Sequence, residues 1–158
     1  MIDWLTVTIP FRHRPLHAGR ITAISPDGSV EWDIPQRTKA RGSFEQSTQV
    51  RSTGHMDRDG YISEIQLDGN PSKFLQGQNV WGTDDVCLLA VHWFKRIADE
   101  FGLHYSVFDL YRISRGAFTI GRVDINYTYA LPGEIQAQQF LIALGESSGT
   151  KYRRAYTN

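Results

Sequence analysis

An amphipathic helix expected over residues 83–101 is the feature that most constrains the fold of this chain. Its apolar side chains recur at spacings of three and four, so they lie on one helical face. Gly102 follows at a position where a left-handed residue ends a helix, and Thr83 or Asp84 is the expected N-cap. Because such a face has to be buried, another layer must pack on it. The apolar positions are Val86, Leu89, Ala90, Trp93, Phe94, Ile97 and Phe101.

Strands are expected both before and after this helix in the sequence. After it, residues 105–114 and 118–130 are predicted to be two strands joined at Arg115 and Gly116, and Pro132–Leu144 a second helix that ends at Gly145. This order predicts an α+β fold, an antiparallel sheet with two main helices packed on one face. Before the helix, the first predicted element is a strand over Ile2–Ile9 that is stopped by Pro10. A hairpin over 20–34 that turns at 26–29 is expected next. A polar alternating segment over 37–53, with a turn or bulge at Gly42, and a strand over 61–68 complete the predicted first half.

The length and composition predict one soluble domain and give no indication of its partners. We expect a domain over residues 1–145 and a flexible basic tail over 146–158. Seventeen basic and seventeen acidic residues cancel, so any electrostatic site must be local. The N-terminus has no basic segment ahead of an apolar run, and no uncharged apolar stretch approaches membrane length, so neither a signal peptide nor a spanning helix is expected. The glycine-rich loop over 67–85 lacks the Gly-Lys-Ser/Thr motif of nucleotide-binding loops.

Two aspartates raise the possibility of a metal site. In "IGRVDINYTY", period two places Arg122, Asp124 and Asn126 on one strand face, and aspartate is a poor strand residue. Asp3 likewise interrupts an apolar run in the first strand. If the two strands are neighbours, Asp3 and Asp124 point into one pocket and suit a hard divalent cation. The alternative is a solvated face, with an Arg122–Asp124 surface pair and a turn aspartate at the chain start.

Basic and amide side chains form a second candidate site. Arg37, Lys39 and Arg41 alternate along the chain, a spacing that suits a phosphate backbone but also an ordinary solvated strand. In the loop over 67–85, glycines permit sharp turns while polar side chains are available to phosphate or bases. The remaining candidate nucleic-acid contacts are Lys73, Gln76, Asn79 and Arg122.

Three segments of the sequence resemble the gene II family, the replication initiation proteins of filamentous bacteriophages. They are "MIDWLTVTIPF", "GNPSKFLQGQNVWGTDD" and "IGRVDINYTY", in the same order and at similar spacing. The resemblance implies a rolling-circle initiator nuclease domain that acts in the cytoplasm of a bacterial host. Such a protein binds the phage origin as double- and single-stranded DNA and works beside a host helicase. By matching position, the family's acidic ligands for Mg²⁺ or Mn²⁺ fall on Asp3 and Asp124.

The resemblance also implies site-specific nicking and joining of DNA through a tyrosine. In the family this tyrosine lies beyond the point where this chain stops at "KYRRAYTN", so the role is not carried onto Tyr152 or Tyr156. We expect the N-terminal portion of an initiator, which binds origin DNA and supports metal-dependent nicking in the full-length protein. The alternative is a non-catalytic truncated initiator that acts as a DNA- or protein-binding regulator.

Overall fold

The computed structural model describes residues 1–16, 19–42, 46–127 and 129–147. These residues belong to two compact units, Met1–Asn126 and Tyr127–Asn158. The expected tail over 146–158 lies almost wholly outside the described residues, so the predicted boundary at residue 145 stays a prediction.

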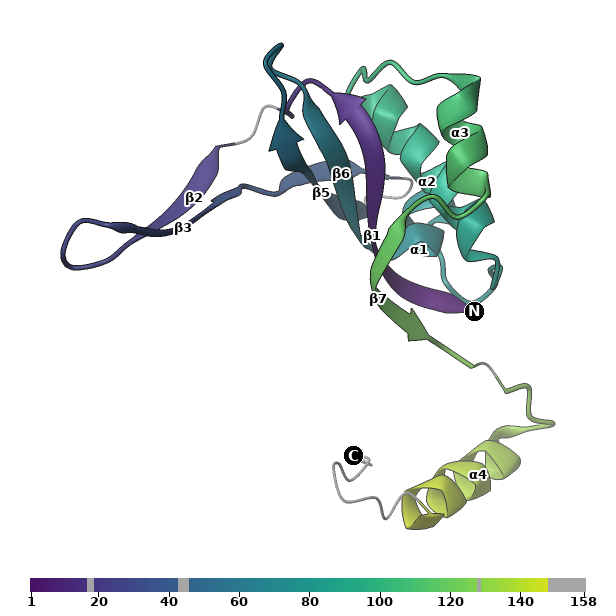
Figure 1. Cartoon of the computed structure of the whole chain (residues 1–158). Coiled ribbons are helices and arrows are strands. Elements are labelled where there is room, and N and C mark those ends of the chain that lie inside the picture. The colour runs from purple at the N-terminus through teal and green to yellow at the C-terminus, as the bar shows by residue number, and fades with distance from the viewer. Residues whose placement is uncertain (17–18, 43–45, 128, 148–158) are drawn as a thin grey trace. The chain divides into compact units, whose positions relative to one another are not determined.

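An antiparallel sheet forms the base of the first unit (Figure 1). Its strands are β1 (Ile2–His13), β4 (Thr38–Arg41), β5 (Ser47–Met56), β6 (Ile62–Gly69) and β7 (Thr119–Ile125). The five strands run in the order β4-β5-β6-β1-β7, so β6 is central and β4 and β7 are edges. Neighbouring strands are antiparallel throughout. The expected α+β class with an antiparallel sheet is confirmed.

Helices cover one face of this sheet and leave the other face open (Figure 1). They are α1 (Pro71–Gln76), α2 (Val86–Glu100) and α3 (Val107–Ser114). The side chains that alternate toward them from the sheet and those on the apolar face of α2 form one buried cluster. Its centre includes Leu5, Val7 and Ile9 on β1 and Trp93, Phe94 and Ile97 on α2, each at most 1% exposed.

The helix α2 has the predicted apolar face and the predicted end, but a different N-cap. Asp85 caps it, because its carboxylate accepts a hydrogen bond from the Leu88 backbone N–H at 2.9 Å. The expected cap at Thr83 or Asp84 is therefore wrong. Thr83 instead accepts a hydrogen bond from the Asp85 backbone N–H, which fixes the capping residue. Gly102 has φ +62°, as a helix stop requires.

Residues 107–114 form the helix α3, so the strand predicted over 105–114 is wrong. The β-branched and aromatic residues of this segment favour a strand by propensity. A capping box overrides them: the Ser106 hydroxyl accepts from the Asp109 N–H, and the Asp109 carboxylate accepts from the Ser106 N–H. Ile113 then packs into the core from this helix.

Two further local predictions are corrected. The first strand does not stop at Pro10 but continues to His13. Because β7 pairs with β1 only as far as Thr8, Pro10 lies where one side of the strand is an edge and its missing N–H is tolerated. The segment expected to be one long loop contains α1, which Asn70 caps and which Gly77 ends with φ +79°.

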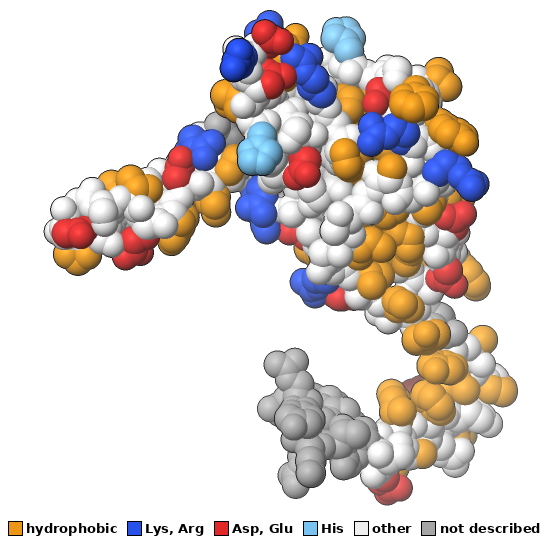
Figure 2. All heavy atoms as spheres, in the orientation of Figure 1, with side chains coloured by type: hydrophobic (Ala, Val, Ile, Leu, Met, Phe, Trp, Pro, Cys, Tyr) orange, Lys and Arg blue, Asp and Glu red, His pale blue; other side chains and the backbone are white. Residues whose placement is uncertain are grey.

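The expected hairpin is confirmed as a separate two-stranded sheet of β2 (Arg20–Ile24) and β3 (Val30–Pro35). Gly28, with φ +86°, lies in its turn. Hydrophobic and acidic side chains are both exposed on this hairpin (Figure 2). Its exposed apolar residues are Ile21, Ile24, Val30, Trp32 and Ile34.

The second unit contains the helix α4 (Glu134–Ser147). The helix predicted here therefore exists, but it runs past Gly145 rather than ending there. None of its residues is buried in the structure. In the parts of the chain that the structure describes, no helix is both long enough and apolar enough to cross a membrane.

A buried histidine ties β1 to β5 by a chain of hydrogen bonds. His13 is 3% exposed, and its Nδ1 lies 2.8 Å from the Phe11 carbonyl oxygen. Its Nε2 lies 2.9 Å from the Ser52 hydroxyl, which accepts from the Leu16 backbone N–H. The neutral ring satisfies this chain by donating from Nδ1 and accepting at Nε2. Burial lowers the pKa of His13, against the opposing effect of the Phe11 carbonyl.

We therefore predict that this histidine makes stability depend on pH in a defined direction. Below about pH 6.5 the unfolded chain protonates the ring while the folded protein keeps it neutral, so the free energy of unfolding should fall as the pH falls. The contribution of one such group is at most about 1.4 kcal/mol per pH unit. Urea denaturation between pH 7.5 and 5 measures it, and His13→Gln should flatten the curve in this window. An unchanged slope in the variant would contradict the assignment.

Candidate functional site

The open face of the sheet is lined with polar side chains from every strand. Alternation along β1 places Thr6 and Thr8 on this face, while Leu5 and Val7 point into the core. Directly paired residues on antiparallel strands share a face, so the register assigns the residues of the other strands. The further polar residues on this face are Gln49, Arg51 and Thr53 on β5, Glu64, Gln66 and Asp68 on β6, and Arg122 and Asp124 on β7.

Asp68 is the centre of the hydrogen-bond network on this face. One carboxylate oxygen accepts from the Trp4 indole N–H at 2.9 Å and from the Thr6 hydroxyl at 2.7 Å. The other accepts from the Arg37 guanidinium at 2.7 Å, and the Asp68 side chain is only 13% exposed. This residue was not among those predicted from the sequence. The available signal was its place at the end of an alternating strand, in phase with the polar Glu64 and Gln66.

The basic residues predicted along 37–41 lie together at the β4 edge of this face. Lys39 pairs with Gln49 in register, and Arg41 pairs with Ser47. Arg37, just before β4, reaches inward and donates to the Gln49 amide oxygen at 2.8 Å as well as to Asp68. Lys39 and Arg41 are exposed and line a hollow with Gly42 and Ser47.

Arg51 extends this positive region onto β5. Its guanidinium donates to the Gln66 amide oxygen at 2.8 Å. Burial and then the nearby charge of Arg37 lower the pKa of Arg51, while Asp68 opposes the shift. Several cations therefore share a small area, and one carboxylate partly compensates them.

On the other side of β1, Arg122 and Asp124 form a pair on the edge strand β7. Arg122 Nε donates to Asp124 Oδ1 at 3.0 Å, and a second bond joins Nη2 to Oδ2. Hydrogen bonding to Arg122 lowers the pKa of Asp124, and the same contact raises the pKa of Arg122. The guanidinium carbon of Arg122 also lies 5.4 Å from the Trp4 ring centre. The pair holds Arg122 beside Trp4 on the open face.

Asp3 occupies a β-bulge and turns toward the segment around α1. Ile2 pairs with Ile125 and Trp4 with Asp124, so Asp3 is an extra residue with no partner of its own on β7. Its Oδ1 accepts from the side-chain amides of Asn70 at 2.7 Å and Asn79 at 2.5 Å. A cleft of about 280 Å³ surrounds this contact and is also lined by Trp4, Gln46, Ser47 and Lys73.

Asp3 and Asp124, the predicted metal ligands, come from neighbouring strands. The groups that surround their carboxylates do not fit a preformed metal centre. Asp3 is held by two amide N–H groups and Asp124 by a guanidinium. These are hydrogen-bond donors and cannot act as ligands for a hard cation. Within the described residues, no group of three or more His, Cys, Asp or Glu side chains gathers as a metal site.

The polar loop residues predicted as contacts mostly stabilise the loop itself. Gln76 donates to the carbonyl oxygens of Gln78 and Trp81. Asn79 holds Asp3, and Asn70 caps α1 by accepting from the Lys73 N–H at 2.8 Å. Among the predicted loop contacts, Lys73 is the charged residue that lines the Asp3 cleft. The polar side chains of the glycine-rich loop therefore stabilise the loop and fix it to Asp3 at this end of the sheet.

Comparison with known proteins shows the family. A model of the family described as the N-terminal region of the phage replication-associated protein, the gene II product, matches residues 1–157. The chain belongs to this family. The replication-associated protein of Enterobacteria phage I2-2 is 37% identical over 157 residues, which cover 99% of this chain and 45% of that protein. The replication-associated proteins of phages fd and M13 are 27% identical over 92 residues, 55% of this chain and 21% of each relative. No solved structure matches the chain.

The family match confirms the resemblance that the three motifs indicated. This chain spans less than half of the length of the I2-2 relative, so it corresponds to the N-terminal part of a gene II protein. The first motif contains most of β1, the middle motif contains α1 and the loop around Asn79, and residues 120–125 of the third motif lie in β7. All three meet around Asp3 and Trp4 at one end of the open face.

We predict that Asp68 is the main electrostatic anchor of this face. Asp68→Asn keeps the shape but turns an amide N–H toward Arg37, so the free energy of unfolding should fall by about 1–2 kcal/mol. Asp33→Asn is the matched control, because Asp33 also pairs with an arginine, Arg20, but on the exposed hairpin. The control should cost less than about 0.5 kcal/mol. Equal losses in urea denaturation would contradict the assignment.

Proposed function

We propose that this chain is the origin-binding N-terminal part of a phage replication initiator, acting in the cytoplasm of a bacterial host. The family description and the names of the relatives, all replication-associated proteins of phages, support the replication role. Initiation requires contact with origin DNA, first as a duplex and then as a separated strand. A host helicase as a further partner belongs to the same proposal and rests on the family resemblance alone.

The cluster of cations on the open face is the observation that carries this proposal. The whole chain has no net charge, yet basic side chains outnumber acidic ones on this one surface. Because phosphate contacts supply most of the sequence-independent affinity for DNA, a local excess of cations matters more than the summed charge. The basic residues are Arg37, Lys39, Arg41, Arg51 and Arg122, against Glu64, Asp68 and Asp124.

The network around these cations suits the positioning of phosphates. Arg37 is fixed by Gln49 and Asp68, and Arg122 is fixed by Asp124, so each loses little freedom on binding. Lys39 and Arg41 are exposed beside a hollow at the β4 edge and are free to follow a backbone. We therefore assign Arg37 and Arg122 to fixed contacts and Lys39 and Arg41 to adaptable ones.

Binding, rather than cutting, is the activity that the geometry favours for this chain. The two carboxylates predicted as metal ligands are already held by amide and guanidinium donors. We route no chemical step through a metal ion, and we assign no nucleophile. Site-specific nicking and joining is proposed for the full-length initiator, with this part as its recognition surface.

We predict that Lys39 and Arg41 together contribute to DNA affinity through phosphate contacts. The double variant Lys39→Ala/Arg41→Ala should weaken binding of a duplex carrying the phage origin by about tenfold or more. It should also reduce the slope of log affinity against log salt by about two, since each lost phosphate contact removes about one. Fluorescence anisotropy across a salt series measures both quantities.

The matched control for this test is Lys95→Ala/Arg96→Ala. It removes the same charge from exposed positions on α2, a helix of the opposite layer. Affinity and salt slope should stay close to those of the parent. If both double variants lose affinity equally, the open face has no special role and the proposed function is wrong.

The divalent cation remains a separate proposal with its own test. If Mg²⁺ or Mn²⁺ binds through Asp3 and Asp124, titration calorimetry with MnCl₂ should show a site that Asp124→Asn weakens by about tenfold or more. Asp33→Asn, which removes a carboxylate from the hairpin, should leave it unchanged. Equal Mn²⁺ affinity in the parent and Asp124→Asn would exclude Asp124 as a ligand.

A further inference from the structure

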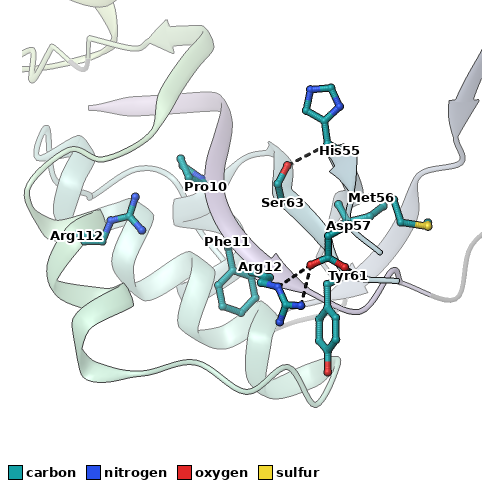
Figure 3. Close-up of a pocket in the computed structure, with 10 residues that line it drawn as sticks. Pro10, Phe11, Arg12, His55, Met56, Asp57, Tyr61, Ser63 and Arg112 are labelled. Carbon is teal, nitrogen blue, oxygen red and sulfur yellow. Dashed lines mark hydrogen bonds and ion pairs between the residues drawn. The ribbon is translucent and has the colours of Figure 1, made fainter. Parts of the chain in front are cut away.

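A third recess lies at the opposite end of β1 from Asp3. It is a cleft of about 330 Å³ between β1, the turn that joins β5 to β6, and α3 (Figure 3). The apolar part of its lining, here called its floor, consists of the buried Phe11 and Ile62 together with Pro10 and Met56. Phe11 is itself locked in the core by an edge-on contact with Phe94, with ring centres 4.9 Å apart. The floor is therefore rigid and hydrophobic.

Two irregularities in strand pairing open this cleft. The register between β1 and β6 shifts between Pro10 and His13, and the register between β5 and β6 shifts between Thr53 and Met56. Both shifts lie opposite the same part of β6, next to Ser63. Because bulges bend and twist the strand that carries them, the two outer strands bend around β6 at this point. The Ser63 hydroxyl accepts from the His55 N–H at 3.0 Å and fixes the bulge of β5.

One rim of the cleft is held by a compact ionic cluster. The Arg12 guanidinium bonds to Asp57 at 2.7 Å and to Asp59 at 3.2 Å, and its carbon lies 3.9 Å from the Tyr61 ring centre. The pKa of Asp57 is lowered mainly by the hydrogen bond that its carboxylate accepts from the Tyr61 backbone N–H, and further by Arg12. Arg12 is thus compensated by two carboxylates and serves to brace the rim.

Two further side chains with nitrogen donors border the cleft, the guanidinium of Arg112 and the imidazole of His55. Figure 3 shows Arg112 on α3 at one side and His55 on β5 at the other. Across the residues that the structure covers, neither the Arg112 guanidinium nor the His55 ring makes a hydrogen bond or ion pair. An apolar floor between two unpaired donors suits a ligand that is flat and apolar in one part and anionic in another.

We propose that this cleft binds one unpaired nucleotide of single-stranded DNA. The base lies on the Pro10, Phe11 and Met56 side, and the flanking phosphates accept hydrogen bonds from Arg112 and His55. A duplex keeps its bases stacked and paired, so it cannot place one on this floor. The proposal rests on the proposed function and deepens it: the cations of the open face contact DNA in either form, and this cleft selects the separated strand.

The test compares affinities for a twelve-residue oligothymidylate and for the origin duplex by fluorescence anisotropy at one salt concentration. Arg112→Ala should weaken binding of the oligothymidylate by about tenfold and change binding of the duplex by less than about twofold. Arg115→Ala is the matched control, because Arg115 follows α3, is exposed and lies outside the cleft. It should change neither affinity.

A crosslink locates the bound strand without depending on a variant. The same oligothymidylate with one 5-bromodeoxyuridine, irradiated in complex with the parent, should attach to peptides that contain Phe11, Met56 or Tyr61. Attachment only to peptides outside the cleft, or equal effects of Arg112→Ala and Arg115→Ala, would overturn the proposed role of the cleft and leave the proposed function standing. Failure of the parent to bind either DNA would overturn both.

Discussion

Burial of the apolar face of α2 is the interaction on which the rest of this structure depends. Trp93, Phe94 and Ile97 can leave water only by covering one face of the sheet, and the alternating Leu5, Val7 and Ile9 supply that face. Each strand then necessarily turns its other side chains to the opposite face. The open face is thus a geometric consequence of the core, because along a strand each side chain that points into the core places its neighbours on the opposite face.

Electrostatic balance on the open face differs from that of the whole chain. A single carboxylate, Asp68 on the central strand, binds Arg37 directly and influences Arg51 and Arg122. It lowers the mutual repulsion of these cations, which would otherwise oppose folding, while leaving positive charge in excess. The same carboxylate holds Trp4 and Thr6, so it links the order of the strands to the arrangement of the charges.

Much of the fold could be predicted from the sequence, but less of the candidate site. The apolar face of α2 and the glycine that ends it follow from local spacing, and the hairpin around Gly28 follows from its turn residues. Residues 105–114 are predicted as a strand from their β-branched and aromatic side chains, whereas the capping box between Ser106 and Asp109 decides for a helix over 107–114. Asp68 was missed, and the partners of Asp3 were not foreseen, because both depend on strand order and on a bulge. Such relations join residues more than sixty positions apart, and local patterns do not encode them.

Because of the paired bulges beside Ser63, substitutions at the rim of the neighbouring cleft and changes in strand length have different effects on the cleft. Substituting a residue at the rim of the neighbouring cleft alters which groups a ligand meets and leaves the bend of the strands as it is. Removing one residue from the bulged stretch of β5 would restore even pairing with β6, straighten the strands and narrow the recess, with each remaining rim side chain still present. The number of residues in these strands therefore encodes the shape of the recess, and their identity encodes its chemistry, so insertions and substitutions would change different properties of this surface.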